Sequence, residues 1–183
     1  MFSDFYGIYK NARNAAWQFL IDYEINQLPI DLNPIIEKLG IKVKVGDEKV
    51  LEPRQKGLTT TDGHATYIIV RKGSMAESRY TIAHELGHGY LGHLLIDGKY
   101  AKTDANEYQA ERFAIDILAP ACVLWGLNLH TAKEISEACN ISITAAQRRA
   151  ERMQILYRRN KFLTHPLECQ VYKQFLNFIN ENK

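Results

Sequence analysis

Three residues in one short segment have the types and the spacing that metal chemistry requires. His84 and His88 are four residues apart, and Glu85 directly follows the first histidine. On a helix, residues four apart lie on the same face one turn apart, so the two imidazoles can bind one metal ion. The Glu85 carboxylate lies at the edge of that face, where it can act on a metal-bound water. The segment predicts two metal ligands, His84 and His88, and a catalytic base, Glu85.

A third ligand is expected further along the chain, because catalytic zinc usually takes three protein ligands and leaves the fourth position to water. Residues 104–120 read DANEYQAERFAIDILAP, a helical pattern that Pro120 ends. Glu107 and Glu111 share one face of it with alanines, which let another helix approach closely. This pattern predicts Glu107 as the third ligand and Glu111 as the acceptor of a hydrogen bond from a ligating histidine. The alternative is a solvated face of two glutamates.

The HExxH segment is expected to lie within a helix of about 20 residues, between Ala76 and Ile96. Gly87, Gly89 and Gly92 are unfavourable there, because each costs about 1 kcal/mol relative to alanine in a helix interior. Their presence is explained if a strand, the Glu107 helix or a peptide substrate packs closely against the HExxH helix.

Other histidines are weaker candidates. His93 follows His88 by five residues, about 140° further around a helix, so it does not share the ligand face. We expect it to contact a metal ligand without being one or to lie in the core; the alternative is that it polarises a substrate carbonyl. His64 is a candidate for stabilising a negatively charged oxygen during a reaction, alongside Tyr80, Tyr90 or Tyr100.

The chain resembles the ImmA/IrrE family of metallopeptidases, found in bacteria and their mobile elements. The matching stretches are Asn14–Val43, Tyr67–His93 and Asn106–Pro120. The resemblance implies one Zn²⁺ per chain, bound by the two HExxH histidines and a glutamate that maps to Glu107, with Glu85 as the base. The family usually has Asn or Asp where this chain has Glu111, and a glutamate can accept the same hydrogen bond.

The resemblance also implies a function. The expected reaction is metal-assisted hydrolysis of a peptide bond, in which Glu85 takes a proton from the water and passes it to the leaving amine. The implied substrate is a helix-turn-helix transcriptional repressor, whose cleavage relieves repression. The family also allows a non-catalytic regulator or an antitoxin-like partner.

The C-terminal part favours a different alternative. Residues 130–157 have the pattern of a helix, a short turn and a second helix, which resembles a helix-turn-helix unit. The region Ser142–Lys161 is basic and could bind DNA, or it could engage a protein substrate. Alternatively, its arginines face water while an apolar stripe docks on the core, formed by Ile143, Ala146, Ala150, Met153 and Tyr157. A net charge of only +2 makes direct nucleic-acid binding the minor alternative.

Bulk properties fit an enzyme of the cytoplasm. Three widely spaced cysteines, an odd number, indicate reduced thiols rather than a disulfide framework. The longest apolar stretch, Ile117–Trp125, is too short to span a bilayer, and the N-terminus has no signal-peptide pattern. We therefore expect a cytoplasmic protein with no membrane partner.

The element pattern predicts an α+β fold, and the resemblance implies a zincin-like metallopeptidase core, in which a small three-stranded sheet packs on the HExxH helix. The expected strands are Ile41–Val45, Gly57–Thr61 and Ala65–Val70. Residues 1–125 are predicted to form the metallopeptidase domain, and residues 126–183 a helical region packed on the same core. The strand Ala65–Val70 is either the sheet edge that receives a substrate strand or an interior strand.

Overall fold

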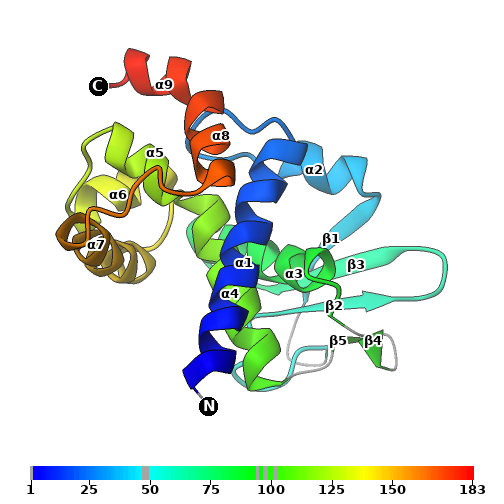
Figure 1. Cartoon of the computed structure of the whole chain (residues 1–183). Coiled ribbons are helices and arrows are strands. Elements are labelled where there is room, and N and C mark those ends of the chain that lie inside the picture. Colours follow the sequence, from blue (N-terminus) through cyan, green and yellow to red (C-terminus); the bar gives the residue numbers. More distant parts are fainter. Residues whose placement is uncertain (1, 47–49, 94, 97–98, 101–102) are drawn as a thin grey trace. The chain divides into compact units, whose positions relative to one another are not determined.

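The computed structural model describes residues 2–46, 50–93, 95–96, 99–100 and 103–183 (Figure 1). The chain forms two compact units, one of Met1–Ala12 with Asp31–Ala114 and the other of Arg13–Ile30 with Ile115–Lys183. These units are defined by how the chain packs. The expected domain boundary after residue 125 was placed on functional grounds, and it stays a prediction. No helix among the described residues is long and apolar enough to cross a membrane.

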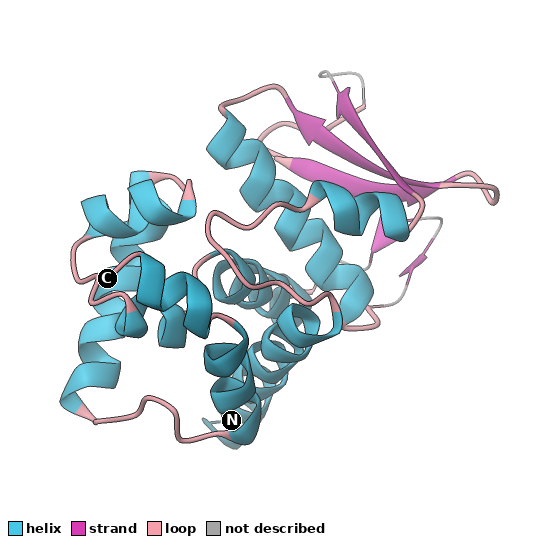
Figure 2. Cartoon of the chain, turned by 90° about the horizontal axis from the view of Figure 1, so that it is seen from above, coloured by secondary structure: helices cyan, strands magenta, loops and turns pink. Residues whose placement is uncertain are grey.

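The first unit contains a mixed sheet with the strand order β1-β3-β2-β5-β4. The strands are β1 (Ile41–Gly46), β2 (Gly57–Thr61), β3 (Thr66–Arg71), β4 (Leu95–Ile96) and β5 (Lys99–Tyr100). Strand β1 is parallel to β3, and the other pairs are antiparallel. Figure 2 distinguishes the three long strands from the two short ones. The three predicted strands are confirmed. Strands β4 and β5 were not predicted, because two residues are too few to give a periodic pattern.

Strand β3 lies inside the sheet, because β1 and β2 flank it. The hairpin that joins β2 to β3 is held by Asp62, whose carboxylate accepts hydrogen bonds from the amides of His64 and Ala65 at 2.9 and 2.8 Å. Of the two alternatives for Ala65–Val70, the interior strand is therefore confirmed and the edge strand is wrong.

The HExxH residues lie on α3 (Met75–Tyr90), which packs against β2 and β3. Its start is a capping box: the Ser74 hydroxyl accepts from the Glu77 amide, and the Glu77 carboxylate accepts from the Ser74 amide. The helix ends earlier than expected, and Gly92 has a φ of +70°. This left-handed conformation, which glycine adopts without a steric penalty, turns the chain out of the helix.

Two glycines of α3 and its end have different roles. A Cβ atom at Gly87 would lie 2.9 Å from Cδ1 of Phe113, so the expected close approach of the Glu107 helix is confirmed at this position. A Cβ atom at Gly92 would meet nothing within 4 Å. The packing explanation is therefore wrong for Gly92, which is needed for its backbone conformation.

The Glu107 helix is α4 (Asp104–Leu118). The Thr103 hydroxyl accepts a hydrogen bond from the Asn106 amide at 3.1 Å, which satisfies a donor of the first turn. In the first unit, α4 buries Ala110, Phe113 and Ala114. The unit also includes the start of α1 (Phe2–Asp22) and the short helix α2 (Asn33–Lys38).

The second unit is helical. It contains α5 (Ala121–Gly126), α6 (Ala132–Cys139), α7 (Ile143–Arg158), α8 (Pro166–Gln174) and α9 (Leu176–Glu181). The predicted helix, turn and helix are confirmed: Asn140 ends α6 with a φ of +49°, and the Ser142 hydroxyl caps α7. Side chains from α6 and α7 pack together, with Ile135 and Met153 buried.

The apolar stripe of α7 differs from the prediction. Ala146, Ala150 and Met153 are buried as expected, but Ile143 is 56% exposed. Arg149, expected to face water, is 1% exposed, and its guanidinium pairs with the Asp116 carboxylate. A buried, paired arginine cannot contact a phosphate, so the basic face of this helix is smaller than the sequence suggests.

Candidate metal centre

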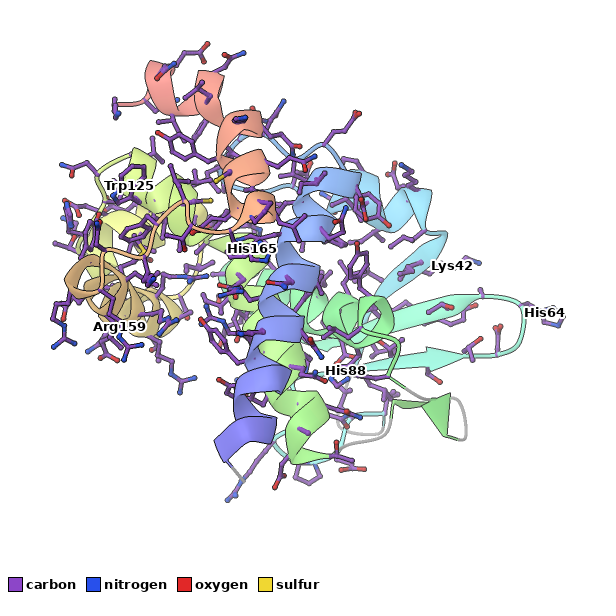
Figure 3. The ribbon with its side chains drawn as sticks, in the orientation of Figure 1. Lys42, His64, His88, Trp125, Arg159 and His165 are labelled. Atoms are coloured by element: carbon purple, nitrogen blue, oxygen red, sulfur yellow. The ribbon has the colours of Figure 1, made fainter. Side chains whose placement is uncertain are left out.

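Three side chains from two helices of the first unit converge on one point. The Nε2 atoms of His84 and His88 are 3.1 Å apart. The two carboxylate oxygens of Glu107 lie 3.4 Å from Nε2 of His84 and 3.6 Å from Nε2 of His88. One ligand atom from each residue lies within 4.8 Å of the others. Helix α3 supplies both nitrogens, and α4 supplies the carboxylate; Figure 3 labels His88.

The donor set fits a divalent cation. Two imidazole nitrogens and one carboxylate are the ligands of catalytic zinc sites of the His₂Glu kind. When two nitrogen lone pairs face a carboxylate at these distances, they repel one another unless a positive charge lies among them. His88 is 2% exposed, whereas the Glu107 side chain is 40% exposed. The donors are therefore anchored on one side and accessible on the other, as a centre that exchanges water or substrate requires.

Glu85 lies beside the three ligands in a buried position. The Thr59 hydroxyl of β2 donates a hydrogen bond to Oε2 of Glu85 at 2.7 Å. Burial raises the pKa of the Glu85 carboxyl, and the hydrogen bonds from Thr59 and the nearby His84 oppose part of this rise. The carboxylate thus has one oriented oxygen and a raised affinity for a proton.

A cleft opens over these residues. It has a volume of about 420 Å³, and both β2 and the segment before it line one side. The lining residues are Arg54, Gln55, Lys56, Gly57, Leu58, Thr59, Tyr80, Thr81, His84, Glu85, His88, Glu107 and Glu111. A side chain at Gly57 would collide with Thr81, so glycine allows β2 to approach α3 at the cleft.

His93 lies behind His88. Its Nδ1 atom is 2.8 Å from Nδ1 of His88, and its Nε2 atom is 3.0 Å from Oε1 of Gln109 on α4. The expected angle of 140° does not apply, because His93 lies past the end of α3. Glu111 is exposed, and its backbone carbonyl accepts a hydrogen bond from the Tyr80 hydroxyl at 3.4 Å. The role predicted for the Glu111 carboxylate stays a prediction.

Sequence reasoning missed Thr59 and Gln109. Thr59 is 26 residues before Glu85, and only the packing of β2 on α3 brings them together. Gln109 is two positions after Glu107, which helical periodicity assigns to the opposite side of α4. The alternation of GLTTT across β2 was the one available signal for Thr59, since Gly57 and Thr59 share a face of that strand.

His64 is not part of the centre. Figure 3 shows it at the tip of the β2–β3 hairpin, away from His88. Its amide donates to Asp62, so its position is that of a turn residue. Tyr80, in contrast, lines the cleft.

A helix carrying HExxH, a carboxylate from the next helix and a cleft over both define the class of metallopeptidases. Residues 36–151 match the peptidase M78 family, described as the IrrE N-terminal-like domain. The match covers more than half of the chain, so this protein belongs to that family, and the predicted resemblance is confirmed. A comparison with curated proteins found no match.

Proposed function

We propose that this protein is a zinc-dependent endopeptidase with a zincin-like core, in which His84, His88 and Glu107 hold one Zn²⁺. The observation that carries the proposal is the convergence of three ligand atoms within 4.8 Å beside a buried carboxylate. When bound, the ion supplies Lewis-acid chemistry: it polarises the scissile carbonyl and lowers the pKa of its water.

Glu85 is the proposed base. The Thr59 hydroxyl donates to Oε2 and the Thr59 backbone also hydrogen-bonds to this carboxylate, so Thr59 orients the group that receives a proton from the attacking water. The raised pKa of the buried carboxyl favours this transfer, because a more basic carboxylate is the better acceptor. Glu85 then gives the proton to the nitrogen of the leaving amine.

The outer edge of β2 is the proposed docking site for the substrate backbone. On that side, the structure shows β2 paired with β5 only between Thr60 and Lys99, among the described residues. The Lys56 carbonyl accepts from the Arg71 amide of the neighbouring strand at 2.8 Å. By alternation, the peptide groups of Gly57 and Thr59 point away from β3. The Thr59 backbone hydrogen-bonds to the Glu85 carboxylate, so the proposed pairing with a substrate strand uses the Gly57 peptide group. An extended peptide that pairs there would lie along the metal ligands.

The family implies a protein substrate, and the resemblance to ImmA/IrrE proteins supports a helix-turn-helix transcriptional repressor. Cleavage of such a repressor would relieve repression. Cys122, Cys139 and Cys169 are thiols that form no disulfide, which supports action in a reducing compartment such as the cytoplasm.

The test is a cleavage assay with purified protein, zinc and the repressor encoded beside its gene. We expect Glu85→Gln to keep stoichiometric zinc and to lose cleavage, and Glu107→Ala to lose both. The matched control is Glu37→Gln, an exposed position on α2, which keeps both. Equal cleavage by wild type and Glu85→Gln would refute the mechanism. Absence of zinc binding by the wild type would refute the metal centre.

A further inference from the structure

We propose that His93 and Gln109 form a hydrogen-bonded chain that sets the tautomer of His88 and so positions a metal ligand. The inference rests on the proposed metal centre. It assigns a positioning role to two residues that are not among the three proposed ligands and do not line the cleft.

The distances define the chain. Nε2 of His88 faces His84 and Glu107, at 3.1 and 3.6 Å, while Nδ1 of His88 faces Nδ1 of His93 at 2.8 Å. Beyond it, Nε2 of His93 lies 3.0 Å from Oε1 of Gln109. Both ring nitrogens of His93 therefore lie within hydrogen-bond distance of a defined partner.

The direction of the hydrogen bonds follows from the ligand role. A neutral imidazole carries one proton, so His88 can ligate through Nε2 only if its proton is on Nδ1. Nδ1 of His93 must then accept that proton's hydrogen bond, which places the proton of His93 on Nε2. The Gln109 carbonyl oxygen accepts from that N–H. Each N–H in the chain points away from the metal and has an acceptor.

The opposite direction would abolish ligation. If Gln109 donated through its amide nitrogen, His93 would carry its proton on Nδ1 and donate to His88. The proton of His88 would then lie on Nε2 and point at His84 and Glu107. With Oε1 of Gln109 toward His93, the chain has the direction in which His88 is a ligand.

The end of α3 places the His93 ring. The His93 amide donates to the His88 carbonyl at 3.0 Å, and the Gly92 amide donates to the Gly89 carbonyl at 3.1 Å. With the positive φ of Gly92, this is the Schellman pattern that closes many helices. His93 is thereby tied to His88 through the backbone as well as through the ring, and a helix continuing past Tyr90 could not make this contact.

Four variants separate a hydrogen-bonding role from a packing role. His93→Ala removes the acceptor, and we expect a zinc affinity about 10 to 100 times weaker. In His93→Asn the side-chain oxygen can occupy the position of Nδ1, so most of the affinity should return. Gln109→Glu can only accept, so it should bind zinc at least as tightly as the wild type. Gln109→Ala alone should weaken zinc binding. Added to His93→Asn, it should leave the zinc affinity of that variant unchanged.

The experiment measures the zinc dissociation constant of the full chain by competition with a chromophoric chelator. The visible spectrum of the Co²⁺-loaded protein reports the ligand geometry, and the unfolding midpoint of the metal-free variants reports folding. Equal affinity of His93→Ala and wild type would overturn the inference, as would equal losses in His93→Asn and His93→Ala. Loss of zinc by Gln109→Glu would reverse the direction of the chain and also overturn it.

The two proposals fail in distinguishable ways. If the wild type binds no zinc, the proposed function fails. If the wild type binds zinc and cleaves in a Glu85-dependent manner while His93→Ala binds zinc equally well, only the positioning role fails.

Discussion

In each of the two units, helix α4 contributes one acidic side chain that lies next to nitrogen-containing side chains. The two arrangements differ in the charge of those side chains. In the second unit, Asp116 is 3% exposed and pairs with Arg149, whose guanidinium also donates to the Ile115 carbonyl at 2.8 Å. In the first unit, Glu107 faces the imidazoles of His84 and His88 and opens onto the cleft. Arginine is a permanent cation, whereas imidazole is not.

This difference separates a structural pair from a binding centre. The Asp116 charge is balanced within the fold, so loss of its partner should destabilise the folded protein. The first unit presents donors toward solvent, where an added cation can balance them. Removal of a donor there should cost metal affinity and little stability.

The largest expected effect is on stability in the second unit. Arg149→Leu removes the guanidinium that pairs with the buried Asp116 carboxylate, so the free energy of unfolding should fall by about 3–5 kcal/mol. Denaturant unfolding of the metal-free protein measures this loss. The matched control, exposed Arg148→Leu, should change stability by less than about 0.5 kcal/mol. Equal effects of the two substitutions would break the comparison.

The next effect is on metal binding in the first unit. Glu107→Ala removes one of three ligands, so zinc affinity should fall by more than about 100-fold, beyond the loss typical of a supporting residue. The free energy of unfolding of the metal-free protein should stay within about 0.5 kcal/mol of the wild type, because this side chain is partly exposed. A large loss of stability without metal would show that Glu107 is structural, as Asp116 is.

A smaller effect concerns the contact between α3 and α4. Gly87→Ala places a methyl group 2.9 Å from the Phe113 ring, and such overpacking costs about 1–3 kcal/mol. Adding Phe113→Leu to this variant should recover part of the loss, since it removes the ring atoms nearest the new methyl. Thermal unfolding of the single and double variants measures both steps. No recovery in the double variant would place the strain elsewhere.

The smallest effect depends on pH in the second unit. Burial raises the pKa of the Glu168 carboxyl above its ordinary value of 4.5, opposed by the Thr164 amide and the charge of Arg13. The folded state therefore binds this proton more tightly than the unfolded state, and the carboxyl destabilises the fold as pH rises above 4.5. Glu168→Gln keeps an oxygen for Thr164 without the charge.

This variant should unfold at a higher temperature than the wild type at neutral pH. The difference should vanish below pH 4.5, where both side chains are neutral. Melting curves across this range test the sign, and a wild type that is more stable than the variant at neutral pH would contradict it.

Local periodicity allowed much of the fold and the centre to be predicted. The helical spacing of His84 and His88, the caps and alanines around Glu107, and the alternation in three strands are short-range signals. The interior position of β3 and the early end of α3 could not be predicted in the same way. The first depends on which strands pair, and the second on a left-handed φ that glycine permits but does not impose.

The local sequence pattern determined the residue types of the metal centre and the elements that carry them. Ligands one helical turn apart lie close together, regardless of what surrounds the helix. The contact of Thr59 with Glu85, the contact of His93 with Gln109 and the burial of Arg149 depend on packing between distant segments. A side chain's partner across such a distance is chosen by how the elements fit together, and spacing along the chain carries no information about it.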